Sequence, residues 1–111
     1  MVEQKRESFR VEFPRSYYPI ITFQGKSFDI FDASEFGIKF YNVSKSNFIQ
    51  DKEINATITF PDNEKFNVKA KIVRIEKKFI SLELLEALPL SKIRAQHLLL
   101  IQKFSEKKSA L

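Results

Sequence analysis

"INATITFPDNEKFNVKAKI" (residues 54–72) decides the fold class, because apolar residues recur at every second position on both sides of a polar turn. The apolar positions are Ile54, Ala56, Ile58 and Phe60 before the turn, and Phe66, Val68, Ala70 and Ile72 after it. A period of two places these side chains on one face of each segment, which is typical of half-buried β-strands. The stretch therefore predicts an antiparallel hairpin with one face in the core.

Four further segments show strand character and extend the hairpin to a barrel. They are residues 17–23, 28–32, 38–43 and 78–84. The phase of the alternation shifts at Ile72 and Val73, as a β-bulge requires. Six short strands separated by turn signals, in a chain with only two glycines, favour an all-β fold in which six antiparallel strands close into a β-barrel.

The alternation stops near Pro89, and residues 89–104 follow a helical period instead. The residues that share one side of the helical wheel are Leu90, Ile93, His97, Leu100, Ile101 and Phe104, whereas Lys92, Gln96 and Lys103 lie away from them. This pattern predicts an amphipathic C-terminal helix whose apolar side, with His97 as a packed or half-exposed member, lies against the barrel. Leu99 falls roughly opposite that side with Leu98 beside it, so we expect an exposed contact there for self-association or for a partner protein.

The length of 111 residues suits a single domain. We expect an N-terminal arm at residues 1–13, the barrel at 14–86, the helix at 87–105 and a solvated tail at 106–111. The arm mixes basic residues with glutamates and has few apolar residues, so its intrinsic structure is expected to be weak.

Composition narrows the classes of function. With no cysteine and one histidine, the chain excludes disulfides, cysteine zinc sites and thiolate nucleophiles. The N-terminus is too polar for a signal peptide, and no apolar run approaches the roughly 20 residues that span a bilayer, so we expect a cytoplasmic protein without membrane insertion. The sequence shows no paired nucleophile and base and no glycine-rich phosphate loop, so neither an enzyme nor a cofactor or metal is expected. A net charge of +5 favours an anionic partner.

Two short motifs flank the first predicted hairpin. "RESFR" (residues 6–10) contains Arg6 and Arg10, and "DASEFG" (residues 32–37) contains Asp32, Ser34 and Gly37. In this order and strand context, RxxxR followed by DxSxxG resembles the PilZ domain family. The resemblance covers nearly the whole chain, and it implies a six-stranded antiparallel β-barrel that binds the bacterial second messenger cyclic di-GMP at these five residues.

The chain departs from the commonest form of that family at two positions. Phe36 stands where a glycine is frequent, and Lys5 precedes Arg6 where a second arginine is frequent. Phe36 in place of glycine reduces the conformational freedom of the turn. Lys5 in place of arginine keeps the positive charge but loses one guanidinium fork. Both changes bear on the affinity and on the number of ligand molecules bound.

The residue types suit the ligand that the resemblance implies. A guanidinium fork holds a phosphate, or the O6/N7 edge of guanine, with two parallel hydrogen bonds. The Asp32 carboxylate accepts hydrogen bonds from guanine N1–H and N2–H₂, Ser34 donates to a phosphate oxygen, and Gly37 lets the backbone turn or approach the ligand closely. We expect the grip of Arg6 and Arg10 to order the arm and thereby to signal to a downstream protein partner that the sequence does not name.

Two other interpretations stay open. A small basic β-barrel could bind single-stranded nucleic acid, with Tyr17, Tyr18 and Tyr41 as stacking residues. The dispersal of basic residues among acidic ones makes nucleic acid the less favoured partner. The same fold could also be a protein interaction module without a ligand, but both motifs are present, which disfavours this interpretation.

Overall fold

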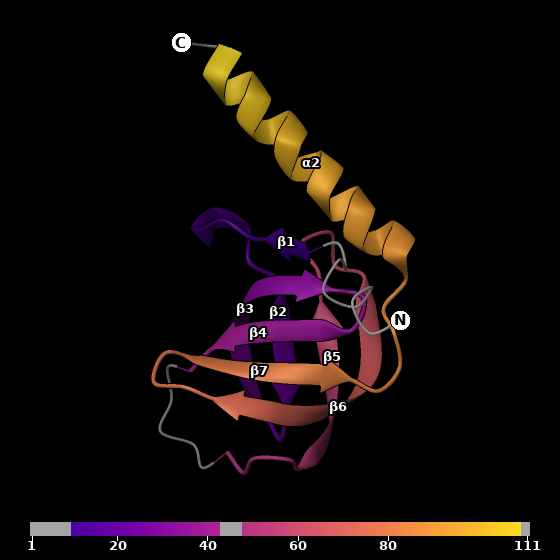
Figure 1. Ribbon diagram of the computed structural model, residues 1–111. Coiled ribbons are helices and arrows are strands. Elements are labelled where there is room, and N and C mark those ends of the chain that lie inside the picture. The colour runs from indigo at the N-terminus through magenta and orange to yellow at the C-terminus, as the bar shows by residue number, and fades with distance from the viewer. Residues whose placement is uncertain (1–9, 43–47, 110–111) are drawn as a thin grey trace, which may run out of the picture.

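The computed structural model describes residues 10–42 and 48–109, with side chains up to Gln102 (Figure 1). The elements of this part are β1 (Arg10–Glu12), the 3₁₀-helix η1 (Arg15–Tyr17), β2 (Ile20–Phe23), β3 (Lys26–Ser34), β4 (Gly37–Tyr41), β5 (Glu53–Thr59), β6 (Lys65–Ile75), β7 (Phe79–Leu84) and the helix α2 (Leu90–Ser109). Strands β2 to β7 correspond to the six strands that the sequence predicts, and β1 is an addition to them.

The six predicted strands close into an antiparallel barrel. The strands are paired in the order β3, β2, β5, β6, β7, β4, and a further pairing of β4 with β3 completes the circle. In the hairpin of β5 and β6, Ile54 lies opposite Ala70 and Ile58 lies opposite Phe66, so the alternating apolar residues face one core. The register shifts between Ile72 and Arg74, which confirms the bulge expected from the phase change. The predicted six-stranded barrel with one C-terminal helix is therefore confirmed.

The core fills the barrel with aliphatic side chains and phenylalanine. The largest fully buried side chains include Phe40, Phe60, Ile21, Ile30 and Ile58. Each such side chain contributes about 1.5–3 kcal/mol to the free energy of folding relative to an exposed position. This rigid frame holds the outer faces of its strands in fixed register.

The described part of the N-terminal arm is a strand that lies on the barrel. Val11 pairs with Ala33 of β3, and the amide of Phe13 donates to the carbonyl of Phe31 at 2.9 Å. Val11 and Phe13 are both buried, and the free energy of burying them holds β1 in place despite the charged residues around it. Residues 1–9, which include Arg6, lie outside the described residues.

Helix α2 is longer than expected. It begins at Leu90 and continues to Ser109, so residues 106–109 of the expected tail are helical, and residues 110 and 111 lie outside the described part. No glycine or proline interrupts residues 90–109, and the lysines and glutamate near the end are good helix formers. The first part of α2 lies against β1 and β3, and the rest projects away from the barrel (Figure 1).

The side of α2 that meets the barrel differs from the predicted one. Ile93 and Leu100 are buried as expected, but Gln96 is buried as well, and Ile101 is 48% exposed. The predictions for Gln96 and Ile101 were therefore wrong. The helix is turned so that positions 93, 96 and 100, which share one side at a spacing of three and four, face the barrel. Leu98 is exposed as expected, whereas Leu99 is half-buried. The self-association surface stays a prediction.

Lys92 explains why the helix is turned this way. Its ammonium lies 2.6 Å from Asp62 Oδ2 and 2.6 Å from Glu64 Oε1 in the turn between β5 and β6, and 5.1 Å from the centre of the Phe60 ring. The side chain is only 9% exposed, although the wheel had placed it away from the barrel. Hydrogen bonding to Lys92 lowers the pKa of Asp62. Burial lowers the pKa of Lys92, but its hydrogen bonds to Asp62 and Glu64 outweigh that effect and raise it overall.

Candidate functional site

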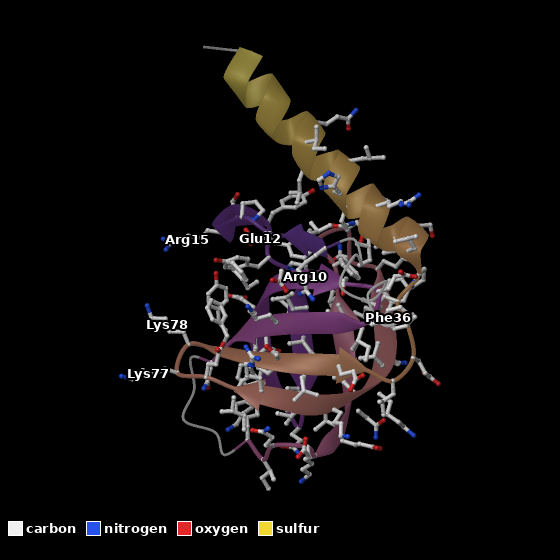
Figure 2. The ribbon with its side chains drawn as sticks, in the orientation of Figure 1. Arg10, Glu12, Arg15, Phe36, Lys77 and Lys78 are labelled. Atoms are coloured by element: carbon white, nitrogen blue, oxygen red, sulfur yellow. The ribbon has the colours of Figure 1, made fainter. Side chains whose placement is uncertain are left out.

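The candidate site lies where β1, the end of β3 and the start of β4 meet. The register places Arg10 opposite Ser34 and Glu12 opposite Asp32, and β4 begins at Gly37. Figure 2 shows Arg10 at the β1 end of the barrel, with Phe36 of the β3–β4 turn to one side. The fold therefore brings the described half of RxxxR next to DxSxxG, although the two motifs are separated by a hairpin in the sequence.

Arg10 and Asp32 form an ion pair. Nη1 of Arg10 donates to Oδ1 of Asp32 at 2.6 Å, which is a short, charge-assisted hydrogen bond. The Asp32 side chain is 5% exposed and the Arg10 side chain is 47% exposed. A carboxylate so deeply buried needs a charged or hydrogen-bonding partner, and Arg10 supplies one. The exposed part of the guanidinium is within reach of a ligand.

Gly37 lies between Arg10 and Ser34. A Cβ atom at this position would lie 3.5 Å from Arg10 Nη2 and 3.6 Å from Ser34 Oγ, which are ordinary contact distances. The φ angle of Gly37 is outside the left-handed region, so the backbone conformation does not require glycine. The turn therefore does not depend on glycine here, and the close approach of a ligand stays a prediction. A side chain here would fill the space between two polar groups.

The register continues from this site across the outer face of the barrel. Asp32 lies opposite Lys39 of β4, Lys39 lies opposite Ser81 of β7, and Gly37 lies opposite Glu83. Because directly opposed residues share a face of the sheet, these side chains form one surface with Arg10 and Ser34. Lys39 was not among the predicted site residues, although its position two residues after Gly37 on an alternating strand was a usable signal.

Four aromatic rings lie beside Lys39 on the same surface. They belong to Tyr18, Phe31, Tyr41 and Phe79, with ring centres 5.1 to 5.7 Å apart in the contacting pairs. The hydroxyl of Tyr18 donates to that of Tyr41 at 2.9 Å, and this hydrogen bond is the largest cause that raises the pKa of Tyr41 to about 12. Tyr18 and Tyr41, two of the expected stacking residues, are thus packed against other rings.

Other kinds of site find little support among residues 10–42 and 48–109. No group of three or more histidine, aspartate or glutamate side chains in this part is placed to hold a metal ion. Over the same residues, no helix combines the length and the apolar character needed to cross a membrane.

The comparisons with solved structures agree on the fold. The chain is similar to the inhibitor of motility MotI/DgrA of Bacillus subtilis, with a TM-score of 0.68, 18% identity and 86% of this chain covered. It is similar to YcgR of Escherichia coli in complex with c-di-GMP, with a TM-score of 0.65, 16% identity and 96% covered. It is also similar to MrkH of K. pneumonia in complex with c-di-GMP, with a TM-score of 0.60, 15% identity and 96% covered.

The chain spans about half the length of these three proteins, with 52%, 49% and 55% of them covered. At these identities the comparisons show the shared fold. Scans against protein-family models and curated proteins found no match.

Proposed function

We propose that the chain is a non-catalytic receptor of the PilZ type that binds cyclic di-GMP through Arg10, Asp32, Ser34 and Gly37, with Arg6 completing the site. The proposal depends on one observation, namely that the fold brings the two motifs into contact. Arg10 donates to Asp32 at 2.6 Å, and its Nη2 lies 3.5 Å from the place that a Cβ of residue 37 would take. YcgR and MrkH, whose structures contain c-di-GMP, share the fold and support the choice of ligand.

The ion pair gives Arg10 and Asp32 complementary roles toward one guanine. The carboxylate accepts hydrogen bonds from the N1–H and N2–H₂ donors of the base, and the guanidinium donates to the O6/N7 edge or to a phosphate. In the free protein each group neutralises the other, so neither charge is buried without a partner. A ligand that offers donors to Asp32 and acceptors to Arg10 replaces the ion pair without leaving either group unsatisfied.

Ser34 and Gly37 form the floor of the site. Ser34 is almost fully buried, and its hydroxyl lies 3.6 Å from the place that a Cβ of residue 37 would take, so we expect a phosphate oxygen to approach it from the side of Gly37. A glycine at this position keeps that space open. The two residues therefore set how closely a phosphate approaches the sheet.

Strand β1 links the site to the rest of the molecule. It carries Arg10, it is held to the barrel by pairing with β3 alone, and α2 lies against it. Ligand contacts that draw on Arg10 and Arg6 would change the position of β1 and of the residues before it. We propose that this movement, with the outer surface of α2, signals to a protein partner.

Calorimetric titration with cyclic di-GMP tests the proposal. Replacing Arg10 with alanine removes a bidentate charged contact and is expected to cost about 1.5–3 kcal/mol, or roughly one to two decades of affinity. Arg94→Ala removes the same charge from an exposed position on α2 and should bind like the wild type. Thermal unfolding of each variant shows whether it is folded before titration.

The proposal fails if the wild type shows no saturable binding at micromolar ligand, or if Arg10→Ala binds as tightly as Arg94→Ala. A single-stranded oligonucleotide serves as the comparison ligand, because the aromatic surface beside Lys39 is the feature that would favour nucleic acid. Preferential binding of the oligonucleotide would replace the proposal with that function.

A further inference from the structure

Lys39 lies at the edge of the proposed site and shares its surface. It is directly opposite Asp32 in the pairing of β3 and β4, and it follows Gly37 by two residues on β4. Residues at this spacing on one strand project from the same face, so Lys39 and Gly37 lie on one side of β4. The Lys39 side chain runs toward Phe79, which lies opposite Tyr41, two residues further along β4. Its position places a positive charge next to the groups that we assign to ligand binding.

Two aromatic rings hold the Lys39 ammonium in place. Nζ lies 5.3 Å from the centre of the Phe79 ring and 6.0 Å from the centre of the Phe31 ring. Both distances are within the range of cation–π attraction, and the rings also cover the apolar stem of the lysine. The side chain is half-buried as a result, so less conformational entropy remains to be lost when it binds an anion.

A comparison with Lys92 shows what Lys39 lacks. Both ammonium groups lie over aromatic rings, but Lys92 also has carboxylate oxygens of Asp62 and Glu64 at 2.6 Å. Among the described residues, Lys39 has no carboxylate within ion-pair distance, and the carboxylate nearest in register, Asp32, is paired with Arg10. Lys39 is thus a positioned cation whose anion is absent from the described part of the protein.

Other charged groups near this surface occur with an opposite charge beside them, so they leave the charge of Lys39 unbalanced. Arg15 and Asp29 act in opposite directions on the pKa of the neighbouring Tyr41. Glu83 lies opposite Gly37 on β7, but Lys71 of β6 lies opposite Glu83 and offsets it. Glu12 lies on the far side of Asp32, across β3 from β4. The Arg10–Asp32 pair carries no net charge, so Lys39 would add positive charge toward a ligand with two phosphates beside the charge that we assign to Arg6.

We propose that Lys39 binds a phosphate oxygen of the same ligand, with Phe31 and Phe79 as the positioning residues that aim its ammonium. This inference rests on the proposed function and deepens it. An ammonium is a point charge without a fork, so Lys39 contributes affinity for the phosphodiester and does not select guanine. Its contribution is electrostatic and falls as the salt concentration rises.

The test is titration of cyclic di-GMP into the wild type, Lys39→Met and Lys77→Met at two salt concentrations. Methionine keeps an apolar stem over the two rings and removes only the charge, so the fold should persist. Lys77 is an exposed lysine at the β6–β7 turn, away from Arg10, and controls for net charge (Figure 2). We expect Lys39→Met to bind roughly tenfold more weakly and with a smaller salt dependence, and Lys77→Met to bind within about twofold of the wild type.

A further variant, Phe79→Leu, tests the positioning role. It keeps the charge of Lys39 and removes the ring that lies nearest to its ammonium, so its affinity should fall between those of the wild type and Lys39→Met. If the wild type binds and Lys39→Met binds equally well, the inference is overturned while the proposed function stands. If the wild type itself shows no saturable binding, both are overturned.

Discussion

The Arg10–Asp32 ion pair should stabilise the protein even without ligand, and a double-mutant cycle measures by how much. The pair is intermediate between a fully exposed and a fully buried ion pair, because the Asp32 side chain is 5% exposed and the Arg10 side chain is 47% exposed. Fully exposed pairs contribute about 0.2–1 kcal/mol, whereas removing one partner of a fully buried pair costs about 3–5 kcal/mol. We therefore expect Arg10→Met to lower the free energy of unfolding by about 2 kcal/mol, with roughly 1–2 kcal/mol of that as coupling to Asp32.

The assay is urea unfolding of the wild type, Arg10→Met, Asp32→Asn and the double variant, all without ligand. Arg94→Met is the matched control, since an exposed arginine on α2 should change the free energy of unfolding by less than about 0.5 kcal/mol. A coupling energy below about 0.3 kcal/mol would show that the ion pair does not hold β1 in the free protein. That result would contradict the proposed exchange of Asp32 between Arg10 and the ligand.

Three further predictions concern the helix contact, the floor of the site and β1. Replacing Lys92 with methionine should lower the free energy of unfolding by about 0.5–1.5 kcal/mol at pH 7. Lys65→Met, at an exposed position at the start of β6, should lower it by less. Because the pKa of Asp62 is lowered in the folded state, its stabilising contribution is present above the unfolded pKa and is lost as the pH falls through the lower folded pKa. The difference in the free energy of unfolding between Lys92→Met and the wild type should therefore shrink as the pH falls below the unfolded pKa of Asp62. Gly37→Ala should unfold within about 1 kcal/mol of the wild type, yet bind cyclic di-GMP more weakly in a titration, and equal binding would contradict its assigned role. Val11→Ala should cost about 1–2 kcal/mol and raise amide exchange in β1 above that in the barrel strands; unchanged exchange would contradict the docking of β1.

Much of the barrel could be predicted from the sequence because strand periodicity is a local signal. The alternation from Ile54 to Ile72 predicts an antiparallel hairpin and the face of it that is buried, and the structure confirms both. The bulge after Ile72 was visible for the same reason, as a change of phase. Such signals need several successive residues, which the barrel strands supply.

Short or long-range features were not predictable in this way. Strand β1 has three residues, too few to show a period, and its charged surroundings concealed the two apolar anchors Val11 and Phe13. The burial of Lys92 and Gln96 depends on how the helix is turned against the barrel, which a helical wheel does not contain. The motif residues were identified through the resemblance to the PilZ domain family, but the ion pair between Arg10 and Asp32 follows from the register of β1 on β3.

The attachment of β1 has a consequence for the dynamics of the protein. Strands β1 and β2 pair with different parts of β3, with η1 between them, and the barrel closes through β2 and β4 without any contribution from β1. Residues 10–12 can therefore leave and return as a local opening, at a fraction of the free energy of global unfolding, while every barrel hydrogen bond stays intact. Ligand affinity and the free energy of this opening become linked quantities, since whatever holds Arg10 also closes the strand over β3. The movement that we propose for β1 would thus be fast and reversible, because the barrel stays folded while β1 opens and closes.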